Sequence, residues 1–131
     1  MRSPDLYLAA SAFYRLLPDW AWLDWMIGVH GDKQRALDYI ERALAIAPMR
    51  VDYHLEHGVV LTCLGVERGD AAALARGRRA LAHARTLPHL LGTDAIDQQN
   101  AAILLEKPEL ACSYSRDGFI DWSGVKQAGT L

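Results

Sequence analysis

The chain lacks the features that define several protein classes. It has no run of eighteen apolar residues, which excludes a membrane-spanning helix. Its net charge is −2 and its isoelectric point about 6.2, so the basic excess of a nucleic-acid-binding protein is missing. Valine, isoleucine and threonine together supply only 16 residues, against 39 alanines and leucines, and this balance favours helix over sheet. At 131 residues the chain is one domain long and can bury enough surface to fold without a disulfide or a metal.

Cysteine is also scarce. The spacing of Cys63 and Cys112 fits no metal or redox motif. Cys63 falls in an apolar helical pattern, where a free cysteine behaves as a small hydrophobe. One disulfide between the two is an alternative, but a reducing compartment is the default expectation.

Asp5 lies where a secretory signal carries positive charge. We therefore expect a cytoplasmic protein, or a periplasmic one if a leader was removed, and eleven arginines against three lysines favour a bacterial source.

Proline and glycine divide the chain into segments of helical length. The clearest is 33–47, whose apolar residues from Ala36 to Ala47 recur with the period of a helix. Gly58, inside another such segment, indicates the close approach of a neighbouring helix. Helices are expected at 5–17, 19–29, 33–47, 51–65, 71–87 and 94–107. Short connections imply antiparallel neighbours, so the predicted fold is all-α: one domain, 1–131, with five or six helices, a helical core at about 5–107 and an irregular tail at 108–131.

One stretch of the chain resembles the 34-residue tetratricopeptide repeat (TPR). The matching residues are Trp20, Leu23, Ile27, Gly31-Asp32, Ala36, Ile40, Ala43 and Pro48. Asp24 stands where the repeat has a small glycine, so 20–31 is either a repeat helix or an insertion that leaves 5–17 as the true first helix. A looser second copy has helices 51–65 and 71–87, a turn lengthened to 65–70, and Pro88 at its end.

The chain is also similar to a divergent branch of this superfamily. That branch contains the regulator-of-microtubule-dynamics proteins and the T-component proteins associated with TRAP transporters, and the likeness lies in residues 32–48, 58–65, 87–88, 93–94 and 104–105. The resemblance implies stacked helix pairs in a short TPR-like solenoid that acts as an interaction scaffold without chemistry of its own.

No motif for catalysis or metal binding stands out. His54 and His57 are three residues apart, but zinc needs three or four ligands and no further histidine or cysteine has a useful spacing, so we interpret the pair as packed or groove-lining. Nothing in the sequence around Cys112 would lower its pKa or hold a base beside it. Phosphate-binding loops and nucleophile elbows are missing. We expect a protein that is not an enzyme, with no metal and no cofactor.

Partner-binding candidates follow from the repeat, in which the first helix of each pair lines the concave face. His54, His57 and Leu61 would line it if 51–65 is a first helix. Tyr7 and Tyr14 would line it if 5–17 is the partner of 33–47.

Two further groups are candidates. Arg76, Arg78, Arg79 and Arg85 lie on one predicted helix, either as a solvated face or as a docking strip for an acidic segment. The tail carries Phe119 and Trp122 and is too apolar to be disordered. We expect it to dock onto its own chain, with a neighbouring subunit as the alternative.

The expected function is a small adaptor that binds a protein or peptide segment on its concave face or arginine strip. Nucleic acid and a membrane span are not expected. One alternative is a transport accessory protein that holds a small ligand in its helical cup. Another is a homo-oligomer that uses the tail or the tryptophans Trp20, Trp22 and Trp25 as its interface.

Overall fold

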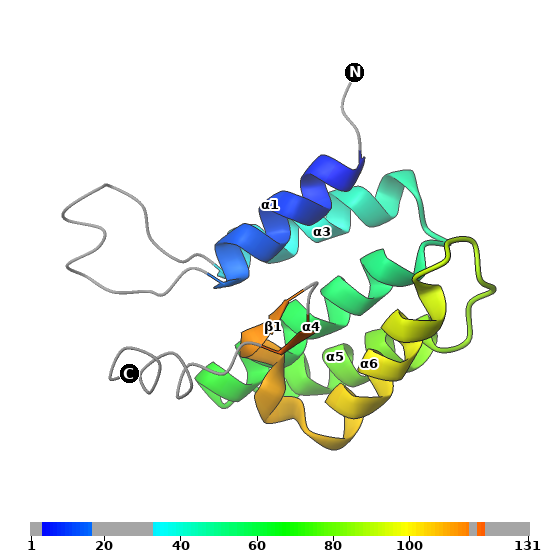
Figure 1. The fold of residues 1–131 in the computed structure, drawn as a ribbon. Coiled ribbons are helices and arrows are strands. Elements are labelled where there is room, and N and C mark those ends of the chain that lie inside the picture. Colours follow the sequence, from blue (N-terminus) through cyan, green and yellow to red (C-terminus); the bar gives the residue numbers. More distant parts are fainter. Residues whose placement is uncertain (1–3, 17–32, 116–117, 120–131) are drawn as a thin grey trace, which may run out of the picture.

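A computed structural model describes residues 4–16, 33–115 and 118–119 (Figure 1). Within these residues the chain forms five α-helices, one 3-10 helix and a short hairpin. The helices are α1 (Pro4–Leu16), α3 (Lys33–Ile46), α4 (Val51–Arg68), α5 (Ala71–Ala84), α6 (Asp94–Glu106) and the 3-10 helix η1 (Pro108–Ser113). The predicted all-α class is confirmed. The helix expected at 19–29, with its three tryptophans, lies outside the described residues.

Helix α4 is the central element of the fold. Its residues Tyr53, Val60 and Leu61 pack into one apolar cluster with α3, against which α1 also lies. Its residues Leu55 and Val59 pack into a second cluster with α5, α6 and η1. In Figure 1, α1 and α3 accordingly lie on one side of α4, and α5 and α6 on the other. The described helices therefore form two groups held together by α4. None of them is long and apolar enough to cross a membrane.

The connection between α4 and α5 is shorter than the sequence predicts. The turn was expected at 65–70, but α4 continues to Arg68 and only Gly69 and Asp70 follow it. Gly69 ends the helix in the left-handed conformation, with φ 63°, and the carboxylate of Asp70 accepts hydrogen bonds from the backbone N–H groups of Ala72 and Ala73 in the first turn of α5. The prediction was wrong because Gly65 is a packing position, where a Cβ atom would lie 2.8 Å from the backbone nitrogen of Leu74.

The first part of the expected irregular tail belongs to the core. Helix η1 begins at Pro108, and β1 (Tyr114–Ser115) pairs with β2 (Gly118–Phe119) in an antiparallel hairpin. Ala111 and Tyr114 are buried in the cluster around α4. Figure 1 shows η1 and β1 alongside α4, which brings a segment from the end of the described chain to its centre.

Candidate functional site

A cavity of about 460 Å³ lies between α1, α4 and α6. Its apolar wall consists of Leu8, Ala9, Ala12, Leu55 and Ile96. Its polar wall consists of Asp5, Asp52, Glu56, Thr93, Asp97 and Tyr114. Among the lining residues that the structure describes, four are acidic and none is basic. A concave apolar surface with a few convergent polar groups is typical of a ligand site.

Arg50 joins two of the acidic residues at the start of α4. Its guanidinium donates two hydrogen bonds to Asp52, of 2.9 and 2.7 Å, and a third of 3.2 Å to Asp5 on α1. The hydrogen bond with Asp52 raises the pKa of Arg50 above its ordinary value. Asp5 also accepts a hydrogen bond of 2.6 Å from the hydroxyl of Tyr53, whose pKa is raised by burial and by this bond. These contacts tie the N-terminal ends of α1 and α4 together.

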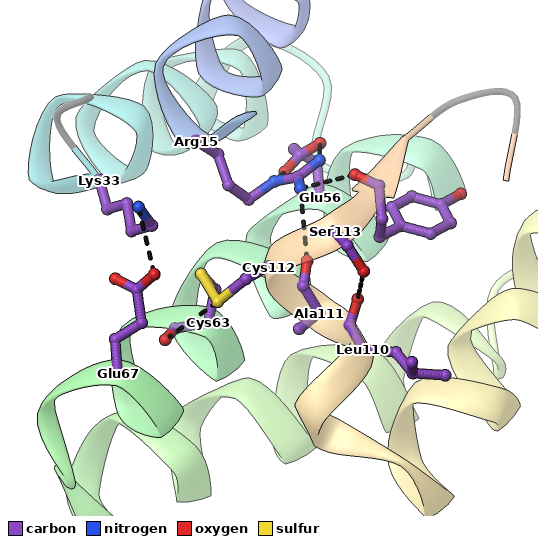
Figure 2. The surroundings of a disulfide bond; sticks show 10 residues. Arg15, Lys33, Glu56, Cys63, Glu67, Leu110, Ala111, Cys112 and Ser113 are labelled. Atoms are coloured by element: carbon purple, nitrogen blue, oxygen red, sulfur yellow. Dashed lines mark hydrogen bonds and ion pairs between the residues drawn. A yellow bond between two sulfur atoms is a disulfide. The ribbon is translucent and has the colours of Figure 1, made fainter. Parts of the chain in front are cut away.

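A second ion pair lies deeper, between α1 and α4. The Nε and Nη2 atoms of Arg15 donate to the two carboxylate oxygens of Glu56 at 2.7 and 3.0 Å. The Nη1 atom of Arg15 donates to the backbone oxygen of Tyr114 at 2.6 Å and to that of Ala111 at 3.3 Å (Figure 2). Arg15 is 2% exposed and Glu56 5%. One buried guanidinium thus connects α1, α4 and the segment that follows α6.

A disulfide makes a second connection to the same segment. Cys63 on α4 is bonded to Cys112 on η1, 49 residues away (Figure 2). Cys63 is buried, as its apolar helical pattern predicts, but the interpretation of it as a free cysteine was wrong. Glu67, one turn further along α4, forms an ion pair of 3.4 Å with Lys33 at the start of α3. Figure 2 shows this pair close to the two sulfur atoms.

The two predicted tyrosine candidates lie on α1 but do not line the cavity. Tyr7 and Tyr14 each stack against Tyr39 of α3, with ring centroids 6.1 and 5.8 Å apart. The hydroxyl of Tyr14 also accepts a hydrogen bond from Arg35 on α3. These rings therefore hold α1 against α3, whereas Leu8, Ala9 and Ala12 of the same helix line the cavity.

The three candidates on α4 also lie away from the cavity. The ring of His54 contacts that of His83 on α5, and its Nε2 lies 2.6 Å from the backbone oxygen of Pro48. His57 lies 3.5 Å from Glu41 of α3. Burial lowers the pKa of both histidines, so both favour the neutral form. Leu61 is buried in the cluster with α3. All three candidates lie on α4, whereas Asp52, Leu55 and Glu56 are the residues of this helix that line the cavity.

The arginine candidates lie on and just after α5. Arg76, Arg78, Arg79 and Arg85 are all exposed, and Arg76 lies 3.5 Å from Glu41. They remain candidates for a docking strip, separate from the cavity. Of the tail candidates, Phe119 is described only by its backbone pairing with Tyr114, and Trp122 lies outside the described residues.

Sequence reasoning missed the residues that form the polar wall of the cavity. Asp5, Asp52, Glu56 and Asp97 come from three helices, and only Asp52 and Glu56 are neighbours on one helix face. Glu56, in a helix that is apolar on most sides, was a signal in the sequence, because a buried acidic residue needs a partner. Comparisons with protein-family models, curated proteins and solved structures found no match to this chain.

Proposed function

We propose that the chain is a non-catalytic binding module that holds a protein or peptide segment in the cavity between α1, α4 and α6. The observation that carries this proposal is the cavity itself, which is concave, partly apolar and about 460 Å³ in volume. The order of the helices also supports it. Helices α1 and α3 pack together, as do α4 and α5, so the cavity is lined by the first helix of each pair and by α6. That is the face on which a TPR-like scaffold binds its partner.

The chemistry of the wall favours a segment that carries a lysine or arginine. Asp5, Asp52, Glu56 and Asp97 place acidic side chains along the described wall of the cavity, and an acidic wall favours an occupant that carries positive charge. The aliphatic stem of such a side chain would pack against Leu55 and Ile96 while its charged end stays near the carboxylates. The arginine strip on α5 is a second candidate surface, suited to an acidic segment.

A displayed-peptide selection tests the proposal with a matched pair of variants. Ala9 is exposed and lines the cavity, so Ala9→Arg places bulk and positive charge in it without disturbing the core. Ala82 is equally exposed on α5, and Ala82→Arg serves as the control. We expect peptides enriched in lysine or arginine to bind the unmodified chain and Ala82→Arg, and to lose binding to Ala9→Arg. Peptides that bind all three proteins equally would contradict a site in the cavity.

The cavity volume also supports the second candidate function, a small-ligand carrier, because pockets for small molecules span about 300–1,000 Å³. Native mass spectrometry of the purified protein separates the two functions. A carrier would retain a bound mass that is lost from Ala9→Arg and kept in Ala82→Arg. A peptide-binding module would show the mass of the polypeptide alone.

The disulfide bears on the compartment in which this module works. Disulfides persist in oxidising compartments and are rare in the cytoplasm. The pairing of Cys63 with Cys112 therefore favours the periplasmic alternative over the cytoplasmic expectation. Trapping of free thiols in intact cells tests this proposal: a protein without free thiols would support it, and one with two would contradict it.

A further inference from the structure

Three potential metal ligands meet where α4 and η1 are joined. The sulfur atoms of Cys63 and Cys112 and a carboxylate oxygen of Glu67 all lie within 4.8 Å of one another. Cys63 and Glu67 are four residues apart on α4 and so share a face of that helix. Cys112 reaches them from η1 (Figure 2). Thiolates and a carboxylate, with one position left for water, are a ligand set that suits zinc.

We propose that Cys63, Cys112 and Glu67 bind one zinc ion when the disulfide is reduced. This site is independent of the cavity, which none of the three residues lines. The oxidised and zinc-bound forms exclude each other, since both use the same two sulfur atoms. The chain would hold zinc before its cysteines are oxidised, or after a dithiol has reduced them.

The two cysteines stay together without the bond between them. Ala111 and Tyr114, on either side of Cys112, are buried in the cluster around α4. Arg15 holds the backbone oxygens of both residues. Reduction therefore leaves η1 packed on α4, and the sulfurs need only separate to the roughly 3.8 Å that two zinc–sulfur bonds of about 2.3 Å impose.

The surroundings favour entry of a cation from one side. Cys63 is fully buried, Cys112 is half-buried and Glu67 is exposed, so an ion would reach the sulfurs past the carboxylate of Glu67. Lys33 lies 3.4 Å from one oxygen of Glu67. A carboxylate has two oxygens, so Lys33 can keep one while zinc takes the other. Two thiolates and one carboxylate carry three negative charges, which one zinc ion and the ammonium of Lys33 balance.

The chemical steps balance. A dithiol gives two electrons and two protons to the disulfide, becomes a disulfide itself, and leaves Cys63 and Cys112 as thiols. Zinc then displaces the two thiol protons, and two zinc–sulfur bonds and one zinc–oxygen bond form.

Cobalt is the probe for the test, because it takes zinc sites and absorbs light strongly when thiolates bind it. The full chain is reduced with a phosphine, freed of the reductant without air, and titrated with cobalt and then with zinc. We expect cobalt–thiolate absorption at one ion per reduced chain, its loss on addition of zinc, and no such absorption from the oxidised chain.

Two variants at exposed glutamates test whether the carboxylate of Glu67 is a metal ligand. Glu67→Gln should weaken cobalt binding by about tenfold or more. Glu106→Gln, at an exposed glutamate near the end of α6, should bind as the unmodified chain does. Equal cobalt absorption from the reduced and oxidised chains would overturn the site, as would a reduced chain that binds no cobalt, whether folded or unfolded. Unchanged affinity in Glu67→Gln would remove Glu67 from the ligand set and overturn the proposal as stated.

Discussion

Arg15 and Glu56 form a buried ion pair that joins the two groups of helices. The guanidinium of Arg15 faces the carboxylate of Glu56 in a two-pronged arrangement, at 2.7 and 3.0 Å, and both side chains are nearly inaccessible to water. The Nη1 group of Arg15 donates to two backbone oxygens in the segment after α6. An arginine can make all these contacts because its planar guanidinium presents several donors in a fixed arrangement. The ammonium of a lysine has no such planar arrangement. The pair therefore fixes α1, α4 and η1 relative to one another.

Loss of one partner of the Arg15–Glu56 pair should lower the free energy of unfolding far more than loss of an exposed ion pair does. Glu56→Gln leaves the charge of Arg15 buried without a counter-charge, and we expect the free energy of unfolding to fall by about 3 kcal/mol or more. Urea denaturation followed by circular dichroism measures this change.

Asp5→Asn is the matched control for this variant. It removes the negative charge from the more exposed pair with Arg50 but keeps an oxygen that can accept the hydrogen bond from Tyr53, so the expected loss of unfolding free energy is below about 1 kcal/mol. Equal losses of unfolding free energy in the two variants would contradict this prediction, because the Arg15–Glu56 pair would then contribute no more to stability than a surface contact does.

The disulfide should contribute substantially to stability, because it closes a long loop. Cys63 and Cys112 are separated by 49 positions in the sequence, and the corresponding loss of chain entropy in the unfolded state is about 4 kcal/mol. Reduction in the presence of a metal chelator should lower the free energy of unfolding by an amount of this order. The Cys63→Ala, Cys112→Ala double variant should behave like the reduced chain. Superimposable urea curves for the oxidised and reduced proteins would contradict this prediction.

Most of the fold could be predicted from local patterns. Pro48, Pro88 and Pro108 mark the ends of helical segments, and the apolar period between them gives α3, α4, α5 and α6. Gly58 indicated a close helix crossing, and a Cβ atom there would lie 2.6 Å from Leu81 on α5. These features are local, because each depends on residues within one or two helical turns.

The candidate site could not be predicted in the same way, since it depends on contacts between distant residues. Arg15 pairs with Glu56, which is 41 residues away in the sequence, and Cys63 is bonded to Cys112, which is 49 residues away. On α4 no local pattern favours the face of Leu55 over that of His54, because the helix is apolar on most sides. Only the packing of α1 and α6 decides which face lines the cavity.

Gly77 should be intolerant of even a methyl group. A Cβ atom there would lie 2.8 Å from the backbone nitrogen of Thr62 and in contact with its hydroxyl oxygen, so α4 and α5 would have to separate. We expect Gly77→Ala to lower the free energy of unfolding by about 1–3 kcal/mol, despite the better helix propensity of alanine.

Gly92→Ala provides the comparison for this prediction. A Cβ atom at Gly92 meets nothing within 4 Å, so the expected change is within about 0.5 kcal/mol. Thermal denaturation of the two variants under the same conditions measures the difference in their stability. A Gly77→Ala protein as stable as Gly92→Ala would mean that the two helices do not cross as closely as described.

Tyr114 should make the protein lose stability in alkaline solution. Burial raises the pKa of its phenol from 10.0 to about 12, although the hydrogen bond from Asn100 opposes the shift. The folded chain therefore keeps the phenolic proton to higher pH than the unfolded chain does. The stability that follows from this difference is complete below pH 10 and is lost as the pH rises toward 12, with a loss on the order of 1 kcal/mol by about pH 11. Tyr114→Phe cannot ionise, so its unfolding free energy should fall less than that of the unmodified chain between about pH 9 and 11. Tyr53 is present in both proteins and its own titration cancels in the comparison, so parallel losses would show that Tyr114 ionises as it does in water.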